Sequence, residues 1–363
     1  MTARAEERRE TSLVAFGLML AIAAGNPPAA GAVLPSTLSD APIPGETSTK
    51  TSSIIPLTDH ERELFASVRA DPEPETTVRG QHYVVSNEQN QQQFKSAIEG
   101  LGGVGIGVGA EQNYLFAGWA RSEVLVLMDF DQAVVDLHAV YRVAFLNAAT
   151  PEEFCALWQK ENRQRLAGLV RDAYAGSSRP KAALRVMREA RYPVGLRLDK
   201  LKEHFTSIGV PTFVTDPAEY AHVRALYQTD RVLQVRGDLK GDRTLRDLAA
   251  RLKEQERVVR WIYLSNAEQY FQYTPKYRRN LLGLPIDDKS VVLRTRPFRF
   301  DYAYVVQSFQ NFALWLGAPH VMSVRAIVPR SLLKGEEPLV EIASLPPPRM
   351  EKRARRGRPG TGE

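Results

Sequence analysis

Glycines at alternate positions, followed by an apolar segment that ends in an acid, constrain the fold of this chain more than any other feature. Residues 103–109 read GVGIGVG, and the apolar run 124–128 (VLVLM) is followed directly by Asp129. A strand, a glycine turn, a short helix, a second strand and an acid are the order in which a Rossmann-type domain builds a nucleoside site. We therefore predict a βαβ unit over this stretch.

The rest of the chain continues the alternation of apolar strands and helices with helical apolar spacing. The predicted elements after this unit are helix 132–148, strand 232–235, helix 243–252, strand 258–264, strand 290–294, helix 302–316 and strand 322–328. Strands separated by helices are typical of a mostly parallel sheet covered on both faces. The predicted fold class is therefore α/β and Rossmann-like.

Changes in composition divide the chain into parts. The predicted parts are a signal peptide over 1–32, a flexible linker rich in Pro, Ser and Thr with one short helix over 33–80, an α/β domain over 81–345 with a folded core that begins near His82 and a helical insertion at 151–206, and a disordered basic tail over 346–363. An insertion at this point of the fold is a candidate lid over the ligand site.

The first 32 residues favour export. The apolar run 13–24 follows a segment with three arginines, and it is too short for a transmembrane helix. Ala30-Gly31-Ala32 is a small-x-small site that permits cleavage before Val33. We therefore expect a periplasmic or secreted protein without a transmembrane domain. The alternative is a cytoplasmic protein with an unstructured N-terminus or a later start at Met19.

The charge is concentrated at the end of the chain. Six basic and two acidic residues lie in 349–363, so this tail supplies four of the six net positive charges. Its sequence Arg356-Gly357-Arg358-Pro359 matches the core of an AT-hook, which enters the DNA minor groove. A four-residue match in a basic, glycine-rich tail arises readily by chance, so we do not expect DNA to be a partner.

Cysteine and histidine usage argues against a metal site. Cys155 is the only cysteine, and the six histidines never occur at HxH or HxxxH spacing. His138 lies on the predicted helix 132–148, where a buried, hydrogen-bonded histidine is favoured over a catalytic base. We therefore predict no metal cofactor.

The cofactor-binding candidates follow the predicted strands. They are Gly105, Gly107, Gly109, Asp129, Gly237 and Asp238. Glycine lets a ligand approach the backbone, and an acid 20 residues after Gly109 accepts hydrogen bonds from ribose hydroxyls. The alternative is that the glycines only allow tight packing and that Gly237-Asp238 is a simple turn.

The substrate-side candidates are polar residues near the same strand ends. They are Asn113, Asn266, Glu268 and Tyr270. The last three follow the strand 258–264, whose carboxyl end faces the ligand crevice in such sheets. The alternative for Ser265 or Asn266 is a helix N-cap, with Tyr270 packing in the core.

Three stretches resemble an uncharacterised bacterial family with an S-adenosylmethionine-methyltransferase-like fold. They are 103–114 (GVGIGVGAEQNY), 124–145 and 263–295, and Ser86-Asn87-Glu88 matches a further family element. The G-x-G-x-G spacing is similar to the glycine loop of class I methyltransferases. In such domains a Gly-Asp like Gly237-Asp238 accepts from the adenine amino group. Where similar proteins have Asp-Ile-Arg-Arg, this chain has Asp129-Phe130-Asp131-Gln132.

The resemblance implies a methyltransferase-like central sheet over 81–345 and a small nucleoside-type ligand, with S-adenosylmethionine as the candidate cofactor. If the protein is an enzyme, it is expected to be an S-adenosylmethionine-dependent methyltransferase. The alternative is an exported, non-enzymatic or different-ligand binding protein that retains the fold without methyl transfer. Export favours this alternative, because S-adenosylmethionine is a cytosolic metabolite.

Overall fold

The computed structural model describes residues 54–77, 80–177, 179–334 and 338–347. The predicted signal peptide and nearly all of the predicted basic tail lie outside these residues. Within them, no helix is both long enough and apolar enough to cross a membrane.

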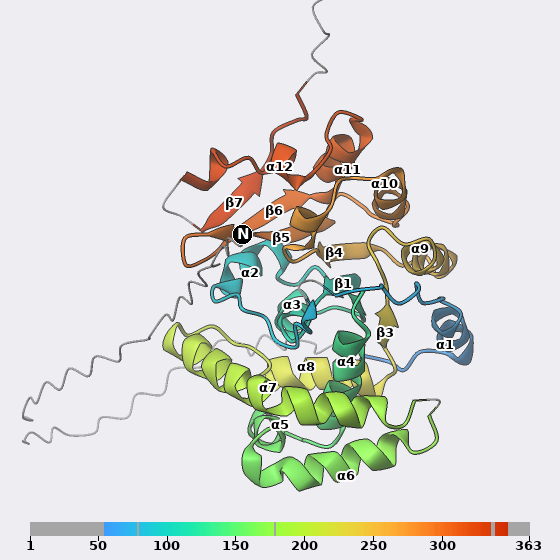
Figure 1. The fold of residues 1–363 in the computed structure, drawn as a ribbon, viewed down its shortest axis with the longest axis vertical. Helices are drawn as coiled ribbons and strands as arrows, with labels where there is room; N and C mark the ends of the chain where they lie inside the picture. The colour runs from blue at the N-terminus through green and yellow to red at the C-terminus, as the bar shows by residue number, and fades with distance from the viewer. Residues whose placement is uncertain (1–53, 78–79, 178, 335–337, 348–363) are drawn as a thin grey trace, which may run out of the picture. The chain divides into compact units, whose positions relative to one another are not determined.

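A seven-stranded sheet forms the centre of the described residues (Figure 1). Its strand order is β3-β2-β1-β4-β5-β6-β7, with the first five strands parallel and β6 and β7 running in the opposite direction. The strands are β1 Val104–Val108, β2 Val124–Asp129, β3 Val232–Arg236, β4 Val259–Tyr263, β5 Val291–Phe298, β6 Asp301–Ser308 and β7 Leu339–Ile342. The prediction of an α/β fold with a mostly parallel, Rossmann-like sheet is confirmed at this level.

Strand β2 shows why the sheet is apolar on both faces. Val126 and Met128 belong to one hydrophobic cluster, whereas Leu125 and Leu127 belong to the cluster on the opposite face. Successive side chains of a strand point to opposite faces, so a continuous apolar run is buried on both sides only when helices cover both.

Helices cover the two faces of the sheet (Figure 1). One face is covered by the short helices η2 Gln91–Phe94 and α2 Lys95–Ile98 and by α3 Gln112–Ala120, α4 Gln132–Leu146, α5 Pro151–Leu157, α6 Arg163–Tyr174, α7 Ala182–Ser207 and α8 Pro217–Gln228. The other face is covered by α1 Asp59–Ala66, α9 Thr244–Glu254, α10 Pro275–Leu282, α11 Phe309–Gly317 and α12 Val324–Ile327. Three further short turns are η3 Lys160–Asn162, η4 Ala267–Tyr270 and η5 Leu332–Lys334.

Two glycines of β1 allow close packing rather than ligand approach. A Cβ at Gly105 would lie 2.2 Å from the Trp261 ring, and a Cβ at Gly107 would lie 2.2 Å from the Asn113 side chain. Trp261 belongs to the neighbouring strand β4, and its Nε1–H donates to Ser122 Oγ at 2.9 Å. The alternating glycines therefore leave room on one face of β1 for a tryptophan and an asparagine.

The region predicted as a helical insertion contains α5, α6 and most of α7, and α7 packs against α4 (Figure 1). Helix α4 in turn packs against β2 and β3. The long helix α7 therefore lies behind α4 as a second layer on one face of the sheet.

Two predicted elements near the C-terminus are wrong. Residues 302–316, predicted as one helix, form most of β6 followed by α11, because Tyr302 to Gln307 pair antiparallel with β5. Residues 322–328, predicted as a strand, contain α12 instead. Both segments are short apolar runs, for which helical and strand periodicity are hard to distinguish.

The sequence predicts a linker with one short helix over 33–80, and the structure describes residues 54–77 and 80 of this range. Helix α1 lies within this range and begins with a capping box at Thr58. Phe65 is buried in the cluster formed with α9, and Asp71 is 1% exposed. The described part of the segment thus packs against the α/β domain, and the folded core begins before His82.

Candidate functional site

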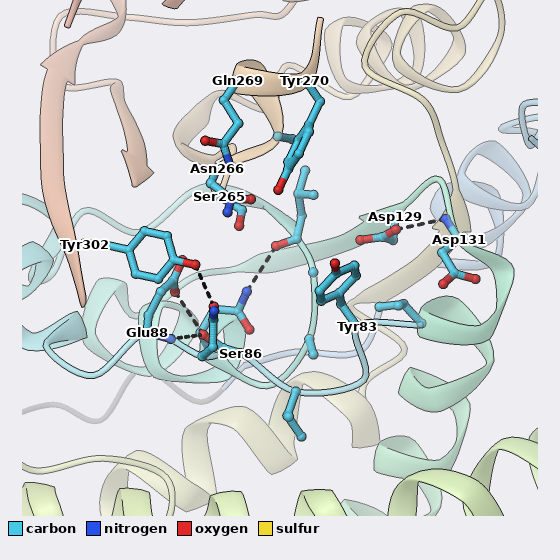
Figure 2. A pocket seen from close by; sticks show the side chains of 18 of the residues that line it. Tyr83, Ser86, Glu88, Asp129, Asp131, Ser265, Asn266, Gln269, Tyr270 and Tyr302 are labelled. Carbon is cyan, nitrogen blue, oxygen red and sulfur yellow. Dashed lines mark hydrogen bonds between the residues drawn. The ribbon is translucent and has the colours of Figure 1, made fainter. Parts of the chain in front are cut away.

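A cavity of about 570 Å³ opens at the carboxyl ends of β1, β2 and β4 (Figure 2). The chain leaves β1 toward α3 on one face of the sheet and leaves β4 toward α10 on the other face. This reversal makes the crevice between β1 and β4 the topological switch point, where ligands bind in open α/β sheets. The cavity is also large enough for a drug-sized ligand.

The turn after β1 forms the floor of the cavity. Gly109 has a φ of 94°, a conformation that side chains with a Cβ rarely adopt, and it lines the cavity. His138 Nε2 lies 2.8 Å from the Gly109 carbonyl oxygen, and its Nδ1 lies 2.8 Å from the Tyr114 hydroxyl. A carbonyl only accepts, so Nε2 carries the proton and Tyr114 donates to Nδ1.

His138 therefore stabilises the backbone of the turn after β1. It is fully buried, and burial lowers its pKa to about 4, which keeps the imidazole neutral. This is the buried, hydrogen-bonded histidine favoured from the sequence.

Asp129 faces the cavity from the carboxyl end of β2. It is 8% exposed, and its Oδ1 accepts the Asp131 backbone N–H at 2.9 Å. Burial is the largest influence on its pKa and raises it to about 7, with a smaller contribution from the charge of Asp131. Asp129 forms no ion pair with any residue in the described part of the chain.

Asp131 has a separate role at the start of α4. Its Oδ1 accepts the Ala133 N–H at 2.9 Å as the helix N-cap, and its Oδ2 lies 2.7 Å from His82 Nδ1. The two neighbouring carboxylates are therefore not equivalent. Asp131 caps α4 and contacts His82, whereas Asp129 has no ion-pair partner among the described residues and faces the cavity.

The loop before η2 forms a second wall, which the sequence analysis did not assign to the site. Ser86 and Glu88 line the cavity, and Glu88 is 3% exposed (Figure 2). Glu88 accepts hydrogen bonds from the Tyr263 hydroxyl, from Thr295 Oγ1 at 2.9 Å and from Ser86 Oγ at 3.0 Å. Burial raises its pKa. The signal available in the sequence was the match of Ser86-Asn87-Glu88 to a family element.

Helix α7 holds this wall in place. Arg197 Nε donates to Glu111 Oε1 at 2.7 Å, and its Nη2 donates to the Glu88 carbonyl at 2.8 Å. Glu111 also accepts the Ser86 N–H at 3.0 Å. The described residues of 151–206 do not line the cavity. The insertion thus supports the wall from behind, in place of the lid expected from the sequence.

The loop after β4 forms the opposite wall (Figure 2). Ser265, Asn266 and Tyr270 line the cavity, and Ser265 has a φ of 52°, which is uncommon for a residue with a Cβ. Tyr302 from β6 also lines the cavity and donates its hydroxyl to Asn87 Oδ1 at 2.9 Å. This contact joins the wall near β6 to the loop before η2.

Glu268 belongs to the same loop but turns away from the cavity. It is 2% exposed, and its Oε2 lies 2.7 Å from Arg294 Nε. The hydroxyls of Tyr273 and Tyr277 donate to its Oε1, the latter at 2.7 Å. Glu268 is therefore a buried structural carboxylate, whose charge is balanced by Arg294.

The structure brings only some of the ten predicted site residues to the cavity. Those that line it are Gly109, Asp129, Asn266 and Tyr270. Those that do not line it are Gly105, Gly107, Asn113, Gly237, Asp238 and Glu268.

Packing and local hydrogen bonds explain why three of these residues lie elsewhere. A Cβ at Gly237 would lie 2.5 Å from Met128 Sδ, so this glycine packs against β2. Asp238 caps its own turn by accepting the Lys240 N–H at 2.8 Å. Asn113 is fully buried and donates to the carbonyl oxygens at both ends of the glycine turn.

The ionisable lining of the cavity is mostly acidic. Glu88, Asp129 and Asp131 contribute carboxylates, and Arg325 contributes a guanidinium. Carboxylates suit hydroxyl and amine donors, whereas a guanidinium suits anions. Over the described residues, no group of three or more His, Cys, Asp or Glu is arranged to hold a metal ion.

A family model described as a domain of unknown function (DUF7790) matches residues 83–338. The chain belongs to the DUF7790 family. The matched part of this DUF7790 domain takes in every residue that lines the cavity except Gln81. No curated protein matches the chain.

Proposed function

We propose that the cavity binds a nucleoside, with the ribose hydroxyls donating to the Asp129 carboxylate. The observation that carries the proposal is the position of Asp129: a buried carboxylate at the end of β2, without an ion-pair partner in the described residues, beside the crevice between β1 and β4. In Rossmann-type domains an acid at this place accepts hydrogen bonds from ribose. Two ribose hydroxyls would add to the backbone N–H of Asp131 as donors to this carboxylate.

The surroundings of Asp129 support this assignment. Gly109 lines the cavity next to it, and the Gln112 amide nitrogen lies 2.6 Å from the place that a Cβ of this residue would take. Phe130 and Val134 line the same region and offer apolar surface to a planar base. A carboxylate beside apolar surface matches the polar sugar and the flat base of a nucleoside.

S-adenosylmethionine is the cofactor that we propose for this site, and its ribose fits. Its adenine amino group would not meet Asp238, which the methyltransferase resemblance assigned to it, because Asp238 does not line the cavity. When bound, this cofactor supplies an activated methyl group. The chain would contribute position: Asp129 fixes the ribose, and Asn266 and Tyr270 face the ligand from the loop after β4.

Isothermal titration calorimetry with S-adenosylhomocysteine and with adenosine tests the proposal on the full chain. We expect binding of both, and Asp129→Asn should weaken it by about 10- to 100-fold, since a hydrogen bond to a charged group contributes about 1.5–3 kcal/mol. Asp238→Asn is the matched control, because it makes the same change outside the cavity, and it should leave the affinity unchanged.

Absence of both heat and thermal stabilisation at millimolar ligand would reject the nucleoside site. Binding of S-adenosylhomocysteine without methyl transfer from S-adenosylmethionine to any acceptor class would instead favour the alternative of a binding protein that retains the fold.

A further inference from the structure

Three arginines gather where β5, α12 and the segment after α12 meet, and we call them the basic rim: Arg296, Arg325 and Arg330. Arg325 is exposed and lines the cavity. Its helix, α12, packs against η4, the turn that carries Tyr270. The basic rim therefore adjoins the wall of the cavity that follows β4.

Arg296 is the half-buried member of the basic rim. Its Nε and Nη1 are enclosed and have no hydrogen-bond partner among the described residues. Arg325 and Arg330 are close enough for their charges to act on it, and together with burial they lower the pKa of Arg296. A desolvated guanidinium beside two like charges is costly unless an anion lies near it.

The acid whose charge acts on Arg296 already has other partners. Glu268 acts on Arg296 from a distance, but its carboxylate lies 2.7 Å from Arg294 and accepts the hydroxyls of Tyr273 and Tyr277. Arg325 itself forms no hydrogen bond or ion pair within the part of the chain that the structure describes. The basic rim thus carries positive charge beyond what the described acids balance.

The basic rim lies far from Asp129. Arg296 is on β5 and Asp129 is on β2, and two strands separate them in the sheet, which places their backbones roughly 14 Å apart at ordinary strand spacing. A nucleoside with its ribose on Asp129 therefore leaves the end beside Arg325 for a different group.

We propose that the basic rim binds a phosphoryl group of a second ligand, which lies beside the nucleoside in the same cavity. Guanidinium groups match the oxygens of phosphate, and a dianion with three acceptor oxygens suits donors that come from different elements. Arg325 makes the direct contact, and Arg296 and Arg330 add to the positive potential. The inference rests on the proposed nucleoside site only for the identity of the neighbouring ligand.

Titration of the full chain with inorganic phosphate, at constant ionic strength set with chloride, tests the basic rim. We expect phosphate to bind the wild-type chain, and Arg325→Gln should weaken this binding at least fivefold. Arg165→Gln is the matched control, because Arg165 is an exposed arginine of α6 outside the cavity. It removes the same charge and should leave phosphate binding unchanged.

Paired titrations separate the two proposals. If adenosine binds but phosphate does not, the phosphoryl site is overturned and the nucleoside site stands. If phosphate binds in an Arg325-dependent manner but no nucleoside does, the proposed function fails and the anion site stands. If phosphate binds alongside adenosine but is displaced by S-adenosylhomocysteine, the basic rim holds the carboxylate of that ligand, and the assignment to a second ligand is overturned.

Discussion

The charged groups near the two ends of the cavity are balanced differently. At the end near β2, Asp129 is buried without an ion-pair partner among the described residues. Near β5, Arg294 and Glu268 form a buried pair, while Arg325 faces the cavity unpaired within the same residues. Glu268 and Arg294 balance each other and lie in the core, where they stabilise the fold. Asp129 and Arg325 have no ion-pair partner among the described residues and line the cavity, where a ligand can contact them. A buried carboxylate with a raised pKa and no ion-pair partner, such as Asp129, is typical of a binding site in a cleft.

The largest expected effect comes from breaking the balanced pair. Arg294→Met leaves the Glu268 carboxylate buried without its cation, which should lower the free energy of unfolding by about 3–5 kcal/mol. Urea denaturation measures it. Adding Glu268→Gln to the variant should recover much of the loss, because the unpaired charge is then gone. A loss below about 1 kcal/mol would show that this pair does not stabilise the β5 end of the cavity.

Asp129→Asn should raise the free energy of unfolding, whereas Arg294→Met lowers it. The carboxyl has a pKa of about 7 when folded against 3.8 as the ordinary value, so the folded state binds more protons and stability falls as pH rises from 4 to 7. Removing the charge should therefore raise the free energy of unfolding by roughly 4 kcal/mol at pH 8, because each pKa unit corresponds to about 1.4 kcal/mol. No gain is expected at pH 4, where the carboxyl is largely protonated in the folded state. A variant less stable than the wild type at pH 8 would contradict the description of Asp129 as unbalanced.

His138→Phe tests how much His138 stabilises the turn after β1, at the end of the cavity near Asp129. It leaves the Gly109 carbonyl and the Tyr114 hydroxyl without this partner, which should cost about 1–2 kcal/mol of unfolding free energy at pH 7.5. In the wild type, the folded pKa of about 4 lies below the ordinary value of 6.5, so stability is lost as pH falls from 6.5 toward 4.

The variant has no imidazole to titrate, so its free energy of unfolding lacks this pH dependence. The difference in unfolding free energy between wild type and variant should therefore become smaller as the pH falls from 6.5 toward 4. His222 serves as an internal reference, because its pKa is also lowered to about 4 and it is unchanged in the variant. A difference in unfolding free energy that stays constant from pH 7.5 to 4.5 would mean that folding does not lower the pKa of His138.

The smallest expected effect is the linkage of adenosine binding to the protonation of Asp129. Ribose hydroxyls donate to ionised Asp129, so adenosine affinity should rise with pH below about 7, by at most tenfold per unit, and become constant above it. Calorimetry in two buffers of different ionisation enthalpy should detect proton release at pH 6.5. Asp129→Asn should abolish both effects, whereas proton release that persists in this variant would assign the linkage to another group.

The repeating part of the fold was predictable from sequence because it depends on local pattern. The glycine turn at Gly109 and the acid at the end of β2, Asp129, belong to one βαβ unit, and both line the cavity. The α/β class and the mostly parallel sheet followed from the same alternation of strands and helices.

What depends on distant contacts was not predictable. Gly105 is small because Trp261 of β4 packs over it, and that depends on the register between two strands far apart in the chain. Glu268 turns inward because Arg294 lies behind it on β5. The wall at Glu88 is assembled from Tyr263 and Thr295, which no local pattern connects to it. The sequence therefore predicts a site role for Gly105 and Glu268 from their residue type and position, although in the structure both contact distant partners instead.

A crystal structure of the chain soaked with S-adenosylhomocysteine tests the nucleoside site itself. We expect density for the ligand in the cavity, with both ribose hydroxyls within hydrogen-bond distance of the Asp129 carboxylate and the ligand beside Gly109. A ribose bound away from Asp129, or a cavity that stays without nucleoside density at saturating ligand, would contradict it.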